Sequence, residues 1–159
     1  MRLLLQRVSR AEVRSGGRVR GAIGSGLVLF VGVGHGDDEA TAESLAARCA
    51  NLRIFRDEAG KTNRSLLDVG GEVLAISQFT LFADTSRGRR PSFLGAAAPE
   101  LGEALYERFS AALEGEGVRV ARGVFGAEME VELVNDGPMT IWLDSDETRA
   151  RRADGRSPG

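Results

Sequence analysis

The sequence predicts one α+β domain, built from a mostly antiparallel sheet that curls into a barrel-like core with two helices packed on it. Three observations predict this class. The chain has 159 residues, of which 42% are apolar, and this is enough for one domain with a sizeable core. Several short segments are rich in β-branched residues and are bounded by glycine. Two longer segments carry apolar residues at helical spacing.

The first expected elements form a hairpin. Residues 3–13 and 18–23 are strand-like, and Ser15-Gly16-Gly17 separates them with glycines that favour a tight turn. Residues 26–33 follow as a continuous apolar run bounded by glycine, which indicates a strand buried on both faces. We therefore expect this third strand in the middle of the sheet.

Two helices are expected from apolar positions that recur at helical spacing. Asp37 or Asp38 can cap the first helix. The second begins at Pro99, which suits a first helical position, and ends near Gly115 and Gly117. The expected buried stripes are Ala42, Leu45, Cys49 and Leu52 in the first helix, and Leu101, Leu105, Phe109 and Leu113 in the second. The single cysteine is thus interpreted as a small core residue.

The remaining expected strands are shorter or interrupted. Residues 53–55 form a short strand before a turn-rich segment, and residues 72–82 form the next one. In residues 127–135 apolar residues alternate with glutamates, which predicts a strand with one buried and one solvated face. Gly137-Pro138 then precedes a strand-like stretch at 140–144. Because proline cannot donate to a sheet and an X-Pro bond can be cis at low cost, either a strand-ending turn or a projecting feature is expected.

Residues 145–159 contain no aliphatic residue larger than alanine. They have nothing to bury, so a disordered polar tail is expected. The sequence therefore predicts a single domain over residues 1–144, without an internal repeat or an interdomain linker.

Composition argues against several kinds of site and partner. The formal net charge is −2 at pH 7, so the chain lacks the overall positive field that drives non-specific nucleic-acid binding. Cys49 is the only cysteine and His35 the only histidine, which leaves no intrachain disulfide and too few ligands for a Cys/His zinc site. We expect no metal and no cofactor. Neither the N-terminus nor residues 26–34 suit a signal peptide or a membrane span, so a cytoplasmic protein is expected.

The glycine-rich segment from Gly32 to Asp38 follows a buried strand and opens a helix, which is the setting of a phosphate-binding turn. Its spacing matches neither the dinucleotide-binding motif nor a P-loop. An ordinary strand-to-helix turn with an exposed His35 is the better interpretation. This histidine has no partner in the sequence that would make it a catalytic base.

Three uncharged polar residues interrupt the apolar run at 72–82. Ser77, Gln78 and Thr80 must either pair with neighbouring strands or present their polar groups to a ligand. A turn-rich segment, 83–93, follows them directly and holds a cluster of arginines that suits contacts with phosphates, although a solvated loop is the alternative. These arginines are Arg87, Arg89 and Arg90.

Four segments together resemble the D-aminoacyl-tRNA deacylase family, also called D-tyrosyl-tRNA(Tyr) deacylases: "NLRIF", "SQFTL", "GRRPSF" and "GVFGAEMEVELVNDGPMT". The resemblance runs from Met1 to Asp144 without a detectable gap. The pairing of SQFT with a Gly-Pro near the C-terminus is specific. Met139 departs from the family, which usually has a smaller β-branched residue there, and we expect no effect on activity because methionine is adaptable.

The resemblance implies a homodimer with two sites at the subunit interface. Each site would combine the SQFT segment of one chain with the Gly-Pro of the other. The catalytic segment would hold the terminal adenosine and the ester carbonyl, and the 2′-hydroxyl of the tRNA would assist hydrolysis. This segment is Ser77, Gln78, Phe79 and Thr80. The substrate-binding residues would be Arg7, Phe125, Met129, Asn135, Gly137 and Pro138, with Arg7 bracing the Gly-Pro segment, and Arg87, Arg89 and Arg90 would contact the tRNA weakly.

The implied reaction is hydrolysis of the ester bond of D-aminoacyl-tRNA, and of glycyl-tRNA mischarged on tRNA-Ala. Rigid backbone around the substrate Cα would leave room for hydrogen or for a D-side chain and would reject an L-side chain. The alternative is a non-catalytic module that binds tRNA or a nucleotide through the arginines and the glycine-rich segment.

Overall fold

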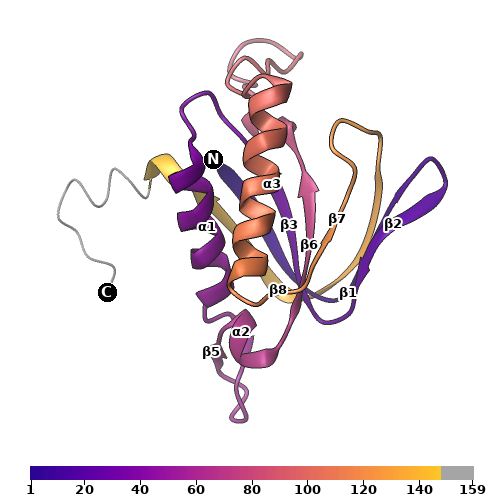
Figure 1. Cartoon of the computed structure of the whole chain (residues 1–159), viewed down its shortest axis with the longest axis vertical. Coiled ribbons are helices and arrows are strands. Elements are labelled where there is room, and N and C mark those ends of the chain that lie inside the picture. Colours follow the sequence, from indigo (N-terminus) through magenta and orange to yellow (C-terminus); the bar gives the residue numbers. More distant parts are fainter. Residues whose placement is uncertain (148–159) are drawn as a thin grey trace.

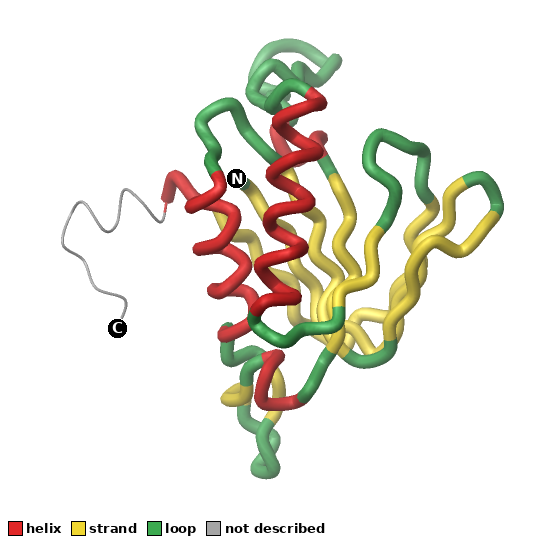
Figure 2. The backbone as a smooth tube through the Cα atoms, in the orientation of Figure 1, coloured by secondary structure: helices red, strands yellow, loops and turns green. Residues whose placement is uncertain are grey.

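The computed structural model describes residues 1–147. A six-stranded mixed sheet curls around the core, and helices α1 (Glu39–Asn51) and α3 (Pro99–Gly115) lie side by side on one of its faces (Figure 1). Figure 2 shows the strands in yellow behind the two long red helices. The predicted α+β class with a barrel-like sheet is confirmed.

Strand β1 (Arg2–Ser15) organises the sheet. On one edge it pairs antiparallel with β3 (Gly26–Gly32) over its first half and with β2 (Arg18–Ile23) over its second half. On its other edge β8 (Glu130–Asp144) pairs antiparallel with it from Arg2 to Arg14. The predicted hairpin and the predicted interior place of the third strand are confirmed.

Parallel strands occupy the other half of the sheet, which is more mixed than the expected, mostly antiparallel arrangement. Strand β6 (Glu72–Ser77) runs parallel to β3, and β7 (Val120–Arg122) runs parallel to β6. Parallel neighbours need a crossover connection, and along the chain α1 lies in the first and α3 in the second. Crossovers share one hand, so both helices cover the same face. The strand–helix–strand order of the sequence already carried this signal.

The two long helices begin where their capping residues predict. The side chain of Asp38 accepts a hydrogen bond from Thr41 N at 2.8 Å, and α3 starts at Pro99. The predicted stripe of α3 is wrong at Leu101, which is 38% exposed. Leu101 precedes Leu113 by twelve residues, and at about 100° per residue the two side chains point about 120° apart around the helix axis. Leu101 therefore lies outside the buried face of α3. Among the described residues, no helix is long and apolar enough to cross a membrane.

The core has two parts that lie on opposite faces of the sheet. Leu3 and Leu5 of β1 pack in the part that includes the two long helices. Val8 and Val13, farther along the same strand, belong to the part enclosed by the curled sheet. The hydroxyl of the buried Tyr106 on α3 donates to the carbonyl of Ala75 on β6 at 2.8 Å, which ties the helix layer to the strand that leads to Ser77.

The expected strand at 72–82 is shorter than predicted. Strand β6 ends at Ser77, Gln78 N still donates to the carbonyl of Val31 at 2.8 Å, and the chain then turns into a 3-10 helix, η1 (Phe79–Phe82). The polar residues therefore mark the end of a strand. Tertiary structure overrides strand propensity here because the segment leaves the sheet where its neighbour β3 also ends.

Two further segments differ in detail from the prediction. Strand β4 (Phe55–Arg56) pairs with β5 (Thr62–Arg64) in a separate hairpin, which leads into the short helix α2 (Leu66–Val69). Strand β8 runs through Gly137-Pro138 without ending. Its pairing with β1 shifts register on both sides of Val8, and such irregularities accommodate a proline within a sheet.

Ser145, the first residue of the expected tail, is buried. Its backbone N donates to the carbonyl of Met1 at 2.9 Å, and its hydroxyl bonds to the Asp37 carboxylate at 3.3 Å. Residues 148–159 of the expected tail lie outside the described residues.

Cys49 should be chemically inert in the folded protein. It is fully buried on α1, and burial raises the pKa of its thiol from its ordinary value of 9.0 to about 12. Such a shift lowers the thiolate fraction at pH 8 by about a thousandfold. We expect a thiol reagent to leave the native protein unlabelled and to label one equivalent at once in denaturant. Fast labelling of the native protein would show that α1 opens locally.

Candidate active site

A cavity of about 670 Å³ lies where β3 and β6 end. Val31 and Ile76 contribute from the strands. The walls come from residues 93–99, which lead into α3, and from residues 125–131, which lead into β8. Most of the lining is apolar, and its polar side chains are Ser77, Gln78 and Glu128. An apolar concavity with a few polar groups is the usual form of a small-molecule site.

The SQFT segment forms one side of this cavity. Ser77, Gln78 and Phe79 line it directly. Thr80 follows in the first turn of η1, where its hydroxyl oxygen accepts a hydrogen bond from the side-chain amide of Gln78 at 2.5 Å. An amide cannot act as a base, and no base is bonded to Thr80 among the described residues. The segment can therefore position a ligand, but it does not have the arrangement of an activated nucleophile.

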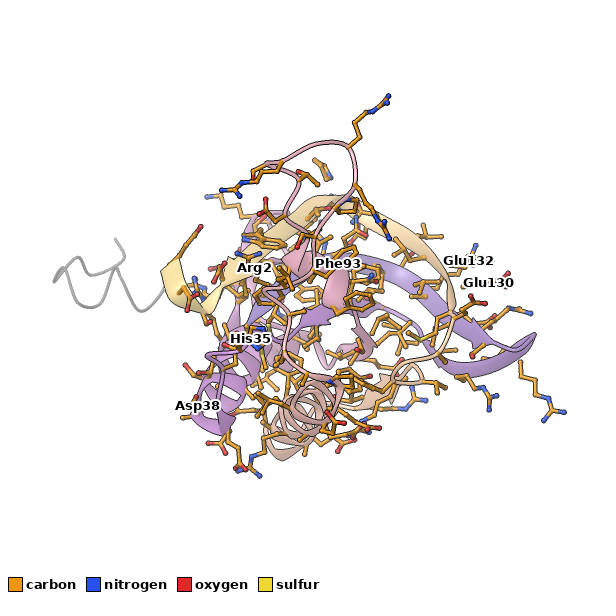
Figure 3. All side chains as sticks on the ribbon, turned by 90° about the horizontal axis from the view of Figure 1, so that it is seen from above. Arg2, His35, Asp38, Phe93, Glu130 and Glu132 are labelled. Atoms are coloured by element: carbon orange, nitrogen blue, oxygen red, sulfur yellow. The ribbon has the colours of Figure 1, made fainter. Side chains whose placement is uncertain are left out.

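Two aromatic rings mark the rim of the cavity. Phe79 and Phe93 meet edge to face with ring centroids 5.2 Å apart, and Phe79 is 56% exposed. Seen from above, Phe93 lies near the centre of the molecule (Figure 3). An exposed aromatic face of this kind is available for stacking on a planar group.

The opposite wall is the loop that carries Phe125 and Met129. The ring of Phe125 packs near Tyr106 with centroids 6.1 Å apart, and Gly102 of α3 leaves space for it, since a Cβ there would come within 3.3 Å of the ring. Val124 N donates to the sulfur of Met129 at 3.3 Å. This loop is thus held to α3 by the packing of Phe125, and the contact between Val124 and Met129 stabilises it internally.

Residues 93–99 form a third part of the cavity wall. This role was not predicted from the sequence, although the motif that contains Phe93 was recognised. Ala97 N donates to the carbonyl of Val33 at 2.9 Å, and Gly34 and Ala96 form a β-bridge. These contacts hold the segment across the end of β3. Its sequence carries no periodic signal, so only the tertiary pairing identifies it.

The loop with the predicted tRNA-contacting arginines projects beside the cavity. The backbones of Asp84 and Ser92 exchange hydrogen bonds of 2.7 and 2.9 Å at its base. Hydrogen bonds from Ser86 hold the pKa of the Asp84 carboxyl below its usual range. Its three arginines are exposed and make no ion pair within residues 1–147: Arg87, Arg89 and Arg90.

A second group of predicted site residues centres on Arg7. This side chain is only 3% exposed, and its Nε lies 2.9 Å from the carbonyl of Asp136 and 3.0 Å from the Asp136 carboxylate. Its Nη1 donates to the carbonyl of Ile54. A buried guanidinium is tolerated only with such a set of acceptors, and here it fixes the backbone next to Gly137.

Asn135 completes this second group. Its side-chain amide donates to the carbonyls of Arg7 at 2.8 Å and Met139 at 3.2 Å, so it spans the base of the segment that holds Gly137-Pro138. The Gly137-Pro138 peptide bond is cis. A Cβ at residue 137 would collide with the side-chain oxygen of Asn135, which explains the need for glycine there.

The structure brings the predicted site residues together in two groups and not in one. Ser77, Gln78, Phe79, Phe125 and Met129 line the cavity, with Thr80 bonded to one of them. The other four predicted residues gather along β1 and β8 and do not line the cavity: Arg7, Asn135, Gly137 and Pro138.

Groups able to hold a metal are not gathered anywhere in the described part of the chain. Within residues 1–147, no three histidine, cysteine or acidic side chains converge. His35 is exposed and its Nε2 bonds to the carbonyl of Leu94 at 2.7 Å, whereas Cys49 lies in the core. His35 thus connects the glycine-rich turn to a wall of the cavity.

Solved structures share this fold. One described as c-Myc DNA Unwinding Element Binding Protein is 38% identical, covers 91% of this chain and 98% of its own, and superposes with a TM-score of 0.84. Another, described as a probable eukaryotic D-amino acid tRNA deacylase, is 17% identical, covers 89% of this chain and 97% of its own, and has a TM-score of 0.78. The second likeness shows the fold alone.

Sequence comparison identifies the family. A relative from Thermomicrobium roseum, named D-aminoacyl-tRNA deacylase, is 60% identical over 97% of this chain and 100% of its own length. A relative of the same name from Deinococcus radiodurans is 58% identical over 91% of this chain and 99% of its own. The family model for D-Tyr-tRNA(Tyr) deacylase matches residues 4–144, which confirms the resemblance, and the chain belongs to this family.

Proposed function

We propose that this protein hydrolyses the ester bond of D-aminoacyl-tRNA and releases the free D-amino acid and tRNA. The observation that carries the proposal is the cavity at the ends of β3 and β6, lined by Ser77, Gln78 and Phe79, in a chain that belongs to a deacylase family. This cavity can take the terminal nucleoside and place the ester at the SQFT segment. We expect the reaction to need no metal or cofactor.

Catalysis would come from positioning. The end of β6 and the turn after it offer the hydroxyl of Ser77, the side-chain amide of Gln78 and backbone N–H groups, all of which can orient an ester carbonyl and stabilise developing negative charge. Phe79 and Phe93 offer aromatic surfaces for the terminal base. The 2′-hydroxyl of the tRNA would assist the attack, which removes the need for an activated side chain.

A second copy of the chain would complete the site. The Gly137-Pro138 group does not line its own cavity, and within the described residues β8 pairs with β1 alone, which leaves its other edge unpaired. Val134 and Trp142 on this strand are 40% and 43% exposed. An unpaired strand with exposed apolar side chains favours association, and a two-fold dimer would use the same surface twice. We therefore propose a homodimer in which each Gly-Pro serves the partner's cavity.

Chiral selection would follow from this arrangement. The backbone at Gly137-Pro138, braced by Arg7, would approach the substrate Cα and exclude an L-side chain. Glycine has no side chain to exclude, so glycyl-tRNA should also be accepted, including that mischarged on tRNA-Ala. Backbone exclusion does not depend on the nature of the D-side chain, which favours broad scope.

The exposed arginine loop would supply the contact with tRNA. Arginine suits phosphate because its planar guanidinium can donate two parallel hydrogen bonds. Arg87, Arg89 and Arg90 lack carboxylate partners within residues 1–147, so their charge is available, and they lie just before the cavity wall. The contact should weaken as salt rises.

The proposed activity is tested by release of free amino acid. Purified protein should release D-tyrosine from D-tyrosyl-tRNA, in the presence of a chelator, and should leave L-tyrosyl-tRNA intact. A non-catalytic binding module would bind both substrates without hydrolysing either. Equal hydrolysis of the two enantiomers would instead contradict chiral exclusion.

Thr80→Ala should keep kcat within about tenfold of wild type, because its hydroxyl is bonded to an amide and has no base, whereas loss of a true nucleophile costs about 10⁶-fold. A substrate that ends in 2′-deoxyadenosine should be hydrolysed far more slowly by the wild-type protein. Mass spectrometry under single-turnover conditions should find no acyl-enzyme. An ester trapped on Thr80 would refute the proposed mechanism.

Complementation tests whether the site is shared between two chains. Gly137→Ala should displace the Asn135 amide and inactivate the Gly137-Pro138 group. A Gln78→Ala/Phe79→Ala variant should inactivate the SQFT segment that lines the cavity. Mixed after unfolding and refolding, the two inactive proteins should recover about a quarter of wild-type activity, because half of the dimers are mixed and each carries one intact site. Mass spectrometry of differently tagged chains checks that mixed dimers form. No recovery with mixed dimers present would place both groups in the site of one chain.

A further inference from the structure

Arg2 lies at the start of β1, next to the turn that carries Phe79 and Thr80. Its Nη1 donates to the carbonyl of Leu81 at 3.1 Å, and its guanidinium lies 4.4 Å from the ring centroid of Phe82. Figure 3 shows Arg2 between the pale yellow end of β8 and the pink segment that follows β6. Arg2 thus contacts η1 through both a backbone carbonyl and an aromatic face.

The other side of Arg2 is fixed to β8. Its Nε donates to the Asp144 carboxylate at 3.0 Å, and its guanidinium lies 5.9 Å from the Trp142 ring centroid. Asp144 is only 11% exposed, so this ion pair is better shielded from water than an ordinary surface pair. These four contacts with η1 and β8 restrict the orientation of the planar guanidinium.

The η1 turn depends on such contacts because burial does not hold it. None of the four residues Phe79–Phe82 is buried. Leu81 and Phe82 do rest against Gly32 and Gly34, where an added Cβ would collide with the Phe82 ring or crowd the Leu81 side chain. The partly buried Phe82 ring therefore lies against glycine backbone and against the Arg2 guanidinium. Loss of Arg2 would remove one of these contacts.

We propose that Arg2 is a positioning residue for the deacylation site, an inference that rests on the proposed function of the SQFT segment. By holding Leu81 and Phe82 against the sheet, Arg2 fixes the turn that carries Phe79, which lines the cavity, and Thr80, which is bonded to Gln78. A shift of about 1 Å in a positioning element can lower a rate by about 10²-fold. Arg2 touches neither the cavity lining nor the substrate in this arrangement, so its effect is on orientation.

The test compares Arg2→Met and Arg2→Lys with wild type in D-tyrosyl-tRNA hydrolysis. We expect Arg2→Met to lower kcat by about 10- to 100-fold and to change KM by less than about threefold, because tRNA binding depends on phosphate contacts elsewhere. Arg2→Lys keeps the charge but not the planar fork, so it should recover part of the loss. Activity of the wild-type protein tests the proposed function separately.

Arg108→Met is the matched control. Arg108 is 47% exposed, compared with 34% for Arg2, and pairs with the Glu43 carboxylate across the two helices α1 and α3. Its loss should leave kcat within about twofold of wild type, since exposed ion pairs contribute little. An equal loss in both methionine variants would overturn the inference.

Amide hydrogen exchange supplies a readout that does not depend on activity. In folded Arg2→Met protein, the amides of Leu81 and Ala83, which donate to Gln78 and Thr80, should exchange faster than in wild type. Amides of α1 should keep their wild-type rates. If Arg2→Met does not fold, Arg2→Lys is measured in the same way. Unchanged exchange at η1 together with unchanged kcat in an active wild-type background would refute the role of Arg2.

Discussion

The hydrogen bonding of β1 on both of its edges is the constraint on which the rest of the fold depends. Backbone N–H and C=O groups in a sheet need partners, and β1 finds them in β8 on one edge and in β3 and then β2 on the other. Segments from both ends of the chain are thereby joined. Leu3 and Leu5, near the start of β1, face the helices, whereas Val8 and Val13, farther along the strand, face the enclosed core.

The place of the cavity follows from the parallel half of the sheet. Strands β3 and β6 run in the same direction, so their carboxyl ends meet at one edge, and the chain leaves the sheet there in both cases. Loops at the carboxyl ends of parallel strands commonly form binding sites. The helices α1 and α3, which lie in the crossover connections, cover one face of the sheet. The edge where β3 and β6 end is instead lined by the cavity walls at residues 93–99 and 125–131. Polar residues that would weaken a strand interior are thus placed at its end.

Two arginines of β1 contact segments that carry the two groups of predicted site residues, the Gly137-Pro138 group and the SQFT segment. Arg7 is buried and fixes the backbone beside Gly137-Pro138, whereas Arg2 contacts η1, the turn that carries Phe79 and Thr80. An odd separation of five residues sends their side chains to opposite faces of the strand, as period-two alternation requires. One strand can therefore brace two groups that lie apart within a single chain.

The sequence by itself determined the class of fold, the two long helices, the first hairpin and the family, because these depend on local periodicity, capping residues such as Asp38 and Pro99, and distinctive motifs. The strand–helix–strand order was a further signal, for the parallel pairs, whereas tertiary structure decided the end of β6 at Ser77 and the cavity wall at 93–99. It also decided that the predicted site residues form two groups. Contacts between segments far apart in the chain leave no periodic trace in either partner, so neither the residue at which β6 leaves the sheet nor the contact of Arg2 with η1 can be inferred from local sequence.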